Sequence, residues 1–480
     1  MNRNRLVVPK NKEVTMRKNI WKKIVPFVAI LLLLLNPITG LEIQASGKSE
    51  KVDDDFMSHE ELGQRLDQIE KTSSGRVEVD VIGHSQQGRD IYAARVGTGN
   101  QVLLINGNIH GNEKSGPEAL MQMFEILGTS DSSRAQAVRE EVTIVAVPRL
   151  NVDGAEITQR QNVFPWDEVI AAYPHLEGAE PAWNYSERNG GFDINRDFNP
   201  DLSYEPVLED LPGSSAEPGF FLTNESRILR ELYLDLKAEF GKVEAFVDLH
   251  HMGTPKTNKT GEDVTIAIDY PPLGPDNSPK YDDWPELDQE KSIRYALAAA
   301  LGVKKFSDDE EPGVARYLHP EERDLPGQAR SSFALNGTAT VLFEMPGQQP
   351  RYGYDQELID RVENGLWGIA TRMADDSINN LNGDDFFSLP KYWTESASDM
   401  KTLVERFKKE GEFDSDDVAR SLSTHLTAVI IYEEKGLSEK IVKHMKIFKL
   451  LLDHQKEKGL IADNAYNRLK DDADYLIEKW

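Results

Sequence analysis

Cysteine is absent from this chain of 480 residues. No disulfide can therefore hold the fold together, so a hydrophobic core, a bound metal or both must stabilise it. The same absence restricts the chemistry of any zinc site, because without thiolates the ligands must be histidines and carboxylates. The chain has only 10 histidines, so the position of each is informative.

Basic residues are scarce relative to acidic ones. The chain has 55 Lys and Arg residues against 82 Asp and Glu residues, which gives a formal net charge of -27. An electrostatic field of this sign repels the phosphate backbone of DNA and RNA. We therefore expect no nucleic-acid partner.

Long apolar runs are missing apart from one near the N-terminus. Residues 1–45 hold eight basic side chains and two acidic ones, and the basic segment precedes the apolar run from Ile24 to Leu35. That run is short for a membrane span, which needs about 20 apolar residues. A basic region, an apolar region and Ala45 at a cleavage position are typical of a signal peptide. We predict a signal peptide at 1–45, export, and no stable membrane span after cleavage; an uncleaved anchor is the alternative.

Strand-like and helix-like patterns alternate from about residue 57 to residue 375. Short β-branched runs, such as QVLLIN (101–106) and VEAFVDLHH (243–251), are separated by longer amphipathic runs, such as 225–240. This alternation predicts an α/β fold with helices flanking a layered sheet. Residues 46–56, which precede it, are polar and predict a flexible segment.

A second unit follows this domain. Residues 376–398 are polar and predict a linker. From 399 to 480 the pattern is helical and repeats, because Gly411 and Gly459 each precede an apolar residue, an Asp and a helical run. Two helix–glycine–helix units predict a small all-α bundle. Nothing in this unit indicates catalysis.

The motif HGNE supplies two candidate metal ligands, His110 and Glu113. A catalytic zinc ion has three protein ligands and one open position. The third candidate lies in VDLHH, where neighbouring residues face opposite sides of a strand, so only one of His250 and His251 can reach the site. We choose His250, which shares a face with Asp248, and keep His251 as the fallback. Zinc is the expected metal, although ligand type alone also permits cobalt or manganese.

Glu344 ends the apolar run TATVLF. A carboxylate there is costly to bury unless it has a partner or a task, so Glu344 is a candidate general base beside the metal. A buried salt bridge is the structural alternative. His110, His250 and Glu344 each follow an apolar run, and in open α/β sheets the ligand crevice lies at the carboxyl ends of the strands. Separate strands are therefore expected to deliver these residues to one edge.

Polar residues in two further motifs indicate a pocket for an anionic group. Arg160 follows PRLNVDGAE, and Asn195 and Arg196 lie in DINRDF. Arginine binds carboxylates through two parallel hydrogen bonds. Asp193 lies two residues before Asn195. A carboxylate often orients a metal-binding imidazole.

Taken together, these segments resemble the zinc metallocarboxypeptidases of the carboxypeptidase A type. HGNE, PRLNVDGAE, DINRDF, VDLHH and LFEMPG occur in that family's order over about residues 57–375. The resemblance implies a single α/β domain with a mixed, mostly parallel sheet. It implies one zinc ion per chain, held by His110, Glu113 and His250.

The resemblance also implies the roles of the remaining residues. Glu344 would act first as general base and then as acid for a zinc-activated water. Arg160 would stabilise the oxyanion of the tetrahedral intermediate, with Arg188 as its rival. Asn195 and Arg196 would hold the terminal carboxylate of a peptide substrate. The expected activity is hydrolytic release of C-terminal amino acids.

Three features depart from the family's pattern. An insert of about 28 residues, 163–190, separates the two arginine motifs and is rich in proline and aromatic residues. Glu322 stands where the family usually has a mobile tyrosine, and Tyr317 is the nearest tyrosine. The segment QARSSF resembles the wall of the specificity pocket, where Arg330 would favour an acidic side chain on the departing residue.

The helical tail resembles the FIMAH module of exported Firmicutes proteins. This implies a secreted or cell-surface protein of a Gram-positive bacterium, with 399–480 as the candidate for contact with the cell surface. Two alternative functions stay open. One is a cell-wall endopeptidase of the same fold that cuts γ-D-glutamyl–diamino acid bonds in peptidoglycan stem peptides. The other is a non-catalytic surface-binding protein, against which the full set of ligands and base argues.

Overall fold

The structure is a computed structural model. It describes residues 56–252, 256–257, 263–274, 279–307, 313–317, 324–346, 354–390 and 396–480. The predicted signal peptide at 1–45 lies outside the described residues, as does the predicted flexible segment except for Phe56. Phe56 is buried and packs on the ring of Tyr354, with 5.3 Å between ring centroids.

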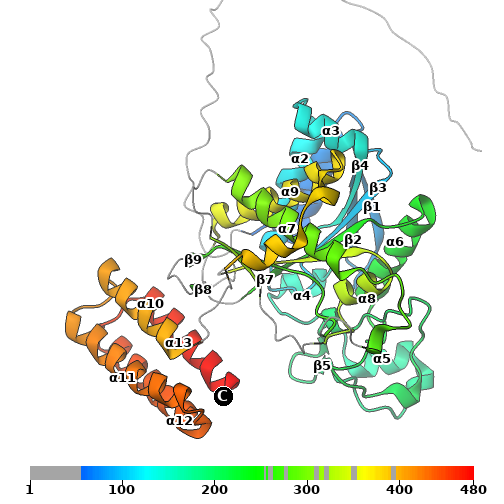
Figure 1. The fold of residues 1–480 in the computed structure, drawn as a ribbon. Coiled ribbons are helices and arrows are strands. Elements are labelled where there is room, and N and C mark those ends of the chain that lie inside the picture. Colours follow the sequence, from blue (N-terminus) through cyan, green and yellow to red (C-terminus); the bar gives the residue numbers. More distant parts are fainter. Residues whose placement is uncertain are drawn as a thin grey trace, which may run out of the picture. The chain divides into compact units, whose positions relative to one another are not determined.

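A mixed eight-stranded sheet forms the middle layer of the first domain (Figure 1), with the strand order β1-β2-β4-β3-β7-β12-β10-β11. The four central strands β4, β3, β7 and β12 are mutually parallel, and β10 pairs with β11 in parallel. The pairs β1–β2, β2–β4 and β10–β12 are antiparallel. These strands are β1 (Val77–His84), β2 (Asp90–Val96), β3 (Gln101–Gly107), β4 (Val142–Val147), β7 (Ala245–His251), β10 (Ile266–Asp269), β11 (Val314–Arg316) and β12 (Ala339–Met345).

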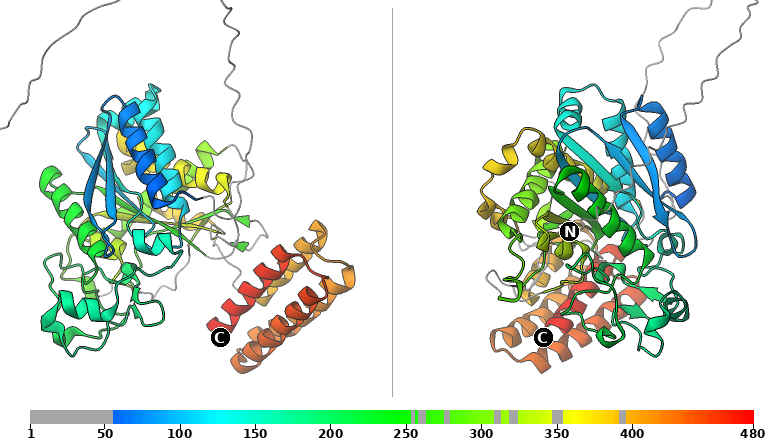
Figure 2. Two further views of the ribbon diagram at one scale, coloured as in Figure 1. Left: turned by 180° about the vertical axis from the view of Figure 1, so that it is seen from behind. Right: turned by 90° about the vertical axis from the view of Figure 1, so that its right-hand side faces the viewer.

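Helices cover both faces of this sheet, and Figure 2 shows the layers from behind and from the side. One face packs on α1 (His59–Thr72), α2 (Ser115–Thr129), α3 (Ser133–Glu141), α7 (Gln289–Phe306) and α9 (Gln356–Ala374). The other face packs on α6 (Asn224–Phe240) and α8 (Ala329–Leu335). The predicted α/β fold with a mixed sheet flanked by helices is confirmed.

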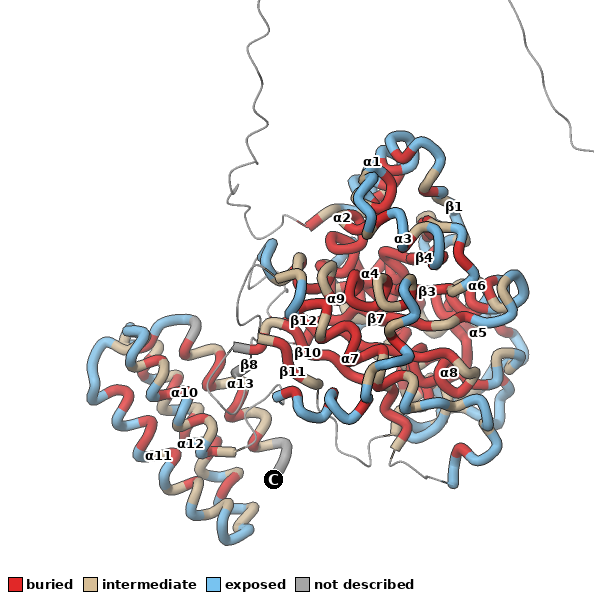
Figure 3. The backbone as a smooth tube through the Cα atoms, turned by 45° about the horizontal axis from the view of Figure 1, so that its top comes forward, coloured by how far each residue is buried: buried red, intermediate tan, exposed pale blue. Residues whose placement is uncertain are grey.

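The central strands are mainly apolar before their carboxyl ends, because both faces of the sheet are covered. All seven residues of β7 and of β12 are buried. Figure 3 shows this burial running through the central strands, while exposed backbone gathers in the connections and on the outer helix surfaces. A polar side chain in these strands therefore needs a partner or a function.

The insert at 163–190 folds with the segment that follows it. Its short elements are α5 (Trp166–Ala172), η1 (Pro174–Leu176) and β5 (Tyr185–Ser186), and β5 pairs with β6 (Gly191–Phe192). A separate hydrophobic cluster, which includes Phe164, Tyr173 and Phe220, holds these elements together. The remaining short elements of the domain are α4 (Val152–Glu156), η2 (Ile194–Arg196), η3 (Leu208–Asp210), β8 (Lys256–Thr257), β9 (Asp263–Val264) and η4 (Pro279–Tyr281).

The predicted linker at 376–398 is too long at its N-terminal end. Residues up to 390 form two short 3-10 helices, η5 (Ser377–Asn380) and η6 (Gly383–Ser388), and belong to the first domain. Ile378, Phe386 and Leu389 are buried in the same hydrophobic core as the sheet and α7. Three spaced apolar side chains within a polar run are enough to hold this segment on the domain.

The C-terminal unit consists of α10 (Ala397–Glu410), α11 (Asp416–Glu434), α12 (Ser438–Glu457) and α13 (Asp463–Lys479), which share one apolar core. Gly411 and Gly459 have φ angles of 77° and 68°, a left-handed conformation that favours glycine. The two repeats meet through an antiparallel bridge between Phe413 and Ile461. The predicted helical bundle with an internal repeat is confirmed. In the described part of the chain, each helix is too short or too polar to cross a membrane.

Candidate active site

Three neighbouring parallel strands bring the predicted site residues to one edge of the sheet. The strand order β3-β7-β12 places the end of β7 between the other two. Glu344 on β12 pairs in register with His250 on β7, so both side chains lie on the same face. His110 and Glu113 lie in the loop that leaves the end of β3 and enters α2.

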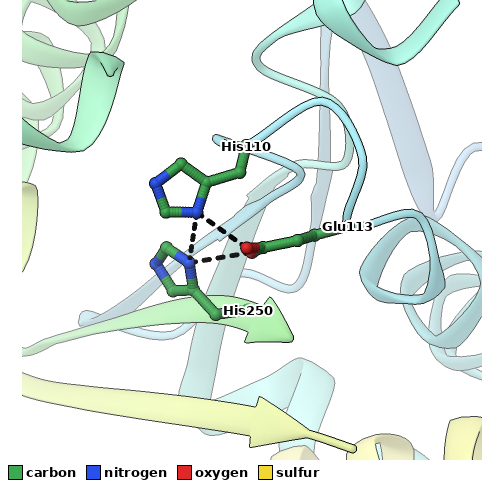
Figure 4. Close-up of side chains that lie close together, drawn as sticks. All are labelled: His110, Glu113 and His250. Atoms are coloured by element: carbon green, nitrogen blue, oxygen red, sulfur yellow. Dashed lines mark hydrogen bonds and ion pairs between the residues drawn. The ribbon is translucent and has the colours of Figure 1, made fainter. Parts of the chain in front are cut away.

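His110, Glu113 and His250 form a compact buried cluster (Figure 4). His110 Nδ1 lies 2.9 Å from Glu113 Oε1, and His250 Nδ1 lies 3.0 Å from Glu113 Oε2. The two Nδ1 atoms are 3.1 Å apart. Four ligands at zinc–ligand distances of about 2.0–2.1 Å would place neighbouring ligand atoms roughly 3.3 Å apart. The spacing in the cluster is close to that value.

The hydrogen bonds around the two imidazoles also fit a metal. His110 Nε2 faces Asp193 Oδ1 at 3.1 Å, and His250 Nε2 faces Asp248 Oδ2 at 2.7 Å. Each Nε2 therefore carries the proton that the carboxylate accepts, which leaves a lone pair on each Nδ1. A zinc ion among these atoms would take the place of the proton that a charged imidazole donates from Nδ1 to Glu113. The donor set thus fits zinc, with two histidines and one carboxylate.

The electrostatics of the cluster favour positive charge. Burial alone lowers the pKa of His250, but the carboxylates of Asp248 and Glu113 raise it to about 10. Burial raises the pKa of Glu113, yet the imidazoles of His110 and His250 hold it well below its usual range. A cation in this cluster would be paired with carboxylates on several sides.

Arg160 borders the cluster. Its Nη1 lies 3.2 Å from His110 Nδ1 and 3.5 Å from Glu113 Oε1, while its Nε and Nη2 both donate to Asp193 Oδ2. Burial lowers the pKa of Arg160, but Asp193 and Glu113 more than offset this, so the guanidinium stays charged. Its rival Arg188 is exposed in the turn between β5 and β6 and is not among the residues that line the cavity.

Glu344 lies in the same cavity and is buried. Among the described residues, its Oε2 atom has no hydrogen-bond partner. Burial is the main cause that raises the pKa of Glu344 to about 7, and the Glu113 carboxylate adds to this against the opposing effect of His250. Within the described part of the chain Glu344 forms no ion pair, so the alternative of a buried salt bridge is not what the structure shows there.

The two residues predicted to bind the substrate carboxylate, Arg196 and Asn195, differ in their hydrogen bonds. Arg196 lines the cavity and donates to the carbonyl oxygen of Asn195 at 2.7 Å. The amide of Asn195 also bonds within the protein: Nδ2 donates to Asp248 Oδ2 at 3.3 Å, and Oδ1 accepts from the Ala329 amide at 3.0 Å. Asn195 lines the cavity together with Arg196, so its predicted role in binding a substrate carboxylate stays a prediction.

Arg330 lines the cavity, and its guanidinium already bonds to other groups of the protein. It is buried, with Nη1 3.3 Å from Asp269 Oδ2 and 2.8 Å from the Tyr270 carbonyl oxygen. Its Nε donates to Gln328 Oε1 at 2.9 Å. Sequence reasoning missed Asp269, because nothing in the spacing of the chain joins β10 to α8.

The other predicted candidates fall in different places. His251 turns to the start of α2, where its Nε2 accepts from the Ser115 amide at 3.2 Å and also meets the Ser115 hydroxyl. The choice of His250 over His251 thus agrees with the geometry. Tyr317 lines the cavity, while Glu322 lies outside the described residues. The whole cavity has a volume of about 250 Å³.

A comparison with known families agrees with this geometry. The sequence model of the zinc carboxypeptidases matches residues 62–301, half of the chain. The chain belongs to the zinc carboxypeptidase family. The matched range contains all three residues of the cluster, and Arg330 and Glu344 lie beyond it. A second model, that of the FIMAH domain, matches residues 397–478 of this zinc carboxypeptidase family member.

The individual proteins that the chain resembles have low sequence identity to it. Zinc carboxypeptidase A 1 of Anopheles gambiae is 28% identical over 134 residues, which cover 27% of this chain and 31% of that protein. The chain therefore spans less than a third of that relative's length. Among solved structures, bovine thrombin-activatable fibrinolysis inhibitor in complex with tick carboxypeptidase inhibitor has 14% identity and a TM-score of 0.45, covering 68% of this chain and 99% of its own. Carboxypeptidase A from Helicoverpa armigera has 18% identity and the same TM-score of 0.45, covering 69% and 76%.

Proposed function

We propose that this chain is an exported zinc metallocarboxypeptidase that removes C-terminal amino acids from peptides. One observation carries the proposal: the His110–Glu113–His250 cluster, Glu344 and three arginines line a single cavity. A hydrolytic site needs a metal, a base and groups that hold the charged ends of the substrate. This cavity offers candidates for each.

Zinc, when bound, would supply the Lewis acidity that peptide hydrolysis requires. Glu344 is the group that can move the proton. Its carboxylate accepts a proton from the attacking water and passes it to the amine of the departing residue. A pKa raised by burial to about 7 suits a group that must accept and release a proton near neutral pH.

Two arginines can pair with the negative charges of the substrate. Arg160, which stays charged beside His110, would stabilise the negative charge that develops on the carbonyl oxygen. Arg196 and Asn195, which both line the cavity, would bind the terminal carboxylate. Selection of a free carboxylate makes the reaction an exopeptidase reaction.

Arg330 would set the side-chain preference. It is the third guanidinium of the cavity; its Nη1 lies near Asp269 Oδ2, and its Nε donates to Gln328. We propose that it favours a departing residue with an acidic side chain. Such a residue brings two carboxylates, one for Arg196 and one for Arg330.

The cell-wall endopeptidase is the second candidate, and the same arginines favour it. A peptidoglycan stem peptide also carries free carboxylates next to the bond that is cut. The two functions differ in product, since one releases free amino acids and the other releases wall fragments.

A substrate panel separates them. It would contain linear peptides that end in Glu, Leu or Lys, the same peptides with amidated ends, and stem peptides with a γ-D-glutamyl–diamino acid bond. Release of amino acids from free-ended peptides only, fastest for Glu, is the expected result. Cleavage of stem peptides alone would replace the proposal with the endopeptidase, and equal cleavage of amidated peptides would remove the carboxylate-binding role of Arg196.

The proposal also includes the location of the protein. We infer that residues 1–45 direct export and that the helical bundle contacts the cell surface of a Gram-positive bacterium. Fractionation of cells that express the full chain and the chain without its last helices tests both points. Full-length protein retained in the cytoplasm would contradict export, and equal amounts of both forms on the cell surface would contradict a role for the bundle.

A further inference from the structure

Asp248 is a buried carboxylate in the middle of β7, two residues before His250. Its side chain is fully buried, and alternation along the strand places it on the same face as His250. Among the described residues, no Lys or Arg forms an ion pair with it, and its one ionic partner is His250. A buried carboxylate is costly unless it is paired and hydrogen-bonded, so the partners of Asp248 indicate what it does.

Amide groups hold both oxygens of Asp248 in place. Oδ1 accepts from Asn106 Nδ2 at 3.0 Å, across the register pair that joins β3 to β7. Oδ2 accepts from Asn195 Nδ2 at 3.3 Å and lies 2.7 Å from His250 Nε2. Asn195 is itself fixed by the Ala329 amide. The carboxylate therefore has little freedom to rotate away from the imidazole.

We propose that Asp248, held by Asn106 and Asn195, is a positioning residue that fixes the tautomer and ring orientation of His250 and thereby raises the affinity of the site for zinc. The inference rests on the proposed function. Because Asp248 accepts a hydrogen bond from Nε2–H of His250, the lone pair of Nδ1 points into the cluster. The loss of such a carboxylate typically costs 10- to 100-fold in metal affinity.

The test compares the zinc dissociation constant of the full chain with that of Asp248→Asn, by competition with a chromogenic chelator. Asparagine keeps the shape and can still accept from Nε2, but it lacks the charge and turns an amide NH₂ towards one of the two asparagine donors. We expect zinc binding about 10- to 100-fold weaker, together with a changed visible spectrum of the cobalt(II) form. Asn106→Ala, which frees only Oδ1, should weaken zinc binding by roughly 2- to 10-fold.

Asp153→Asn is the matched control. Asp153 is also a buried carboxylate, but it forms an ion pair with Arg89, bonds to the Ser85 hydroxyl at 2.8 Å and the Gln87 amide at 2.9 Å, and does not line the cavity. It should change the thermal stability of the metal-free protein and leave zinc binding intact. Unchanged zinc binding in both Asp248→Asn and Asn106→Ala would overturn the inference. Absence of zinc binding by the unaltered chain would instead overturn the proposed function.

Discussion

Replacing Glu344 with glutamine is the perturbation that separates catalysis from metal binding. The substitution keeps the shape of the side chain and removes only its ability to take up a proton. Glu344 is not part of the His110–Glu113–His250 cluster, so zinc should stay bound. General base catalysis contributes about 10²- to 10⁴-fold to rate, which corresponds to about 3–5 kcal/mol on the barrier. We expect kcat to fall by at least about 10²-fold with little change in KM.

Glu225 provides a matched control for this experiment. It is also fully buried, and burial raises its pKa to about 7. It bonds to Asn162 Nδ2 at 3.0 Å and does not line the cavity. Steady-state release of amino acids and zinc content would be measured for Glu344→Gln and Glu225→Gln. Turnover by Glu344→Gln within tenfold of the unaltered chain, or equal losses in both variants, would refute the role of Glu344.

Three further predictions concern specificity and stability. Arg330→Gln should lower the ratio of kcat/KM for peptides ending in Glu to that for peptides ending in Leu by roughly 10- to 100-fold, because a hydrogen bond to a charged group contributes about 1.5–3 kcal/mol; an unchanged ratio would contradict this assignment. The raised pKa of Glu225 means that the folded state binds more protons than the unfolded state between about pH 4.5 and 7, so its contribution to stability falls as the pH rises through that interval. Glu225→Gln should therefore be more stable than the unaltered chain at pH 8, by up to about 3 kcal/mol, and the gain should shrink at pH 5 in urea unfolding; a gain independent of pH would contradict the shift. Gly459→Ala should destabilise the helical bundle by about 1 kcal/mol, since its φ of 68° is left-handed and no atom crowds the position, and an unchanged unfolding midpoint would show that the turn relaxes.

The positions of the metal-site residues could be predicted from the sequence because each one follows an apolar run. Parallel strands covered on both faces are apolar throughout, so a histidine or glutamate at their ends is conspicuous. The alternation of side chains along β7 indicated that only one of His250 and His251 could reach the site, and Asp248 on the same face favoured His250. These inferences need only local periodicity and the general rule that sites lie at the carboxyl ends of strands.

The hydrogen-bond partners of these residues could not be predicted in the same way. Asn106 meets Asp248 because β3 and β7 are neighbours in a particular register, and neither fact is visible in the sequence. The amide of Asn195 donates to Asp248, which lies 53 residues further along the chain, and no local pattern joins the two. The contact between Arg330 and Asp269 likewise joins α8 to β10 across the sheet edge.

The end of the first domain was misjudged for a different reason. Polar composition dominates residues 376–390, and composition is what predicts a linker. Burial of Ile378, Phe386 and Leu389 depends on a free apolar surface on the domain, and the location of such a surface becomes clear only once the helices are packed.

The central claim is that the cavity is a zinc-dependent exopeptidase site. The most direct test is release of amino acids from linear peptides by the purified protein from residue 46 onward, before and after treatment with a chelator. The expected result is release that the chelator abolishes and that added zinc restores. Release that is unaffected by removal of the metal, or no release from any free-ended peptide despite bound zinc, would contradict it.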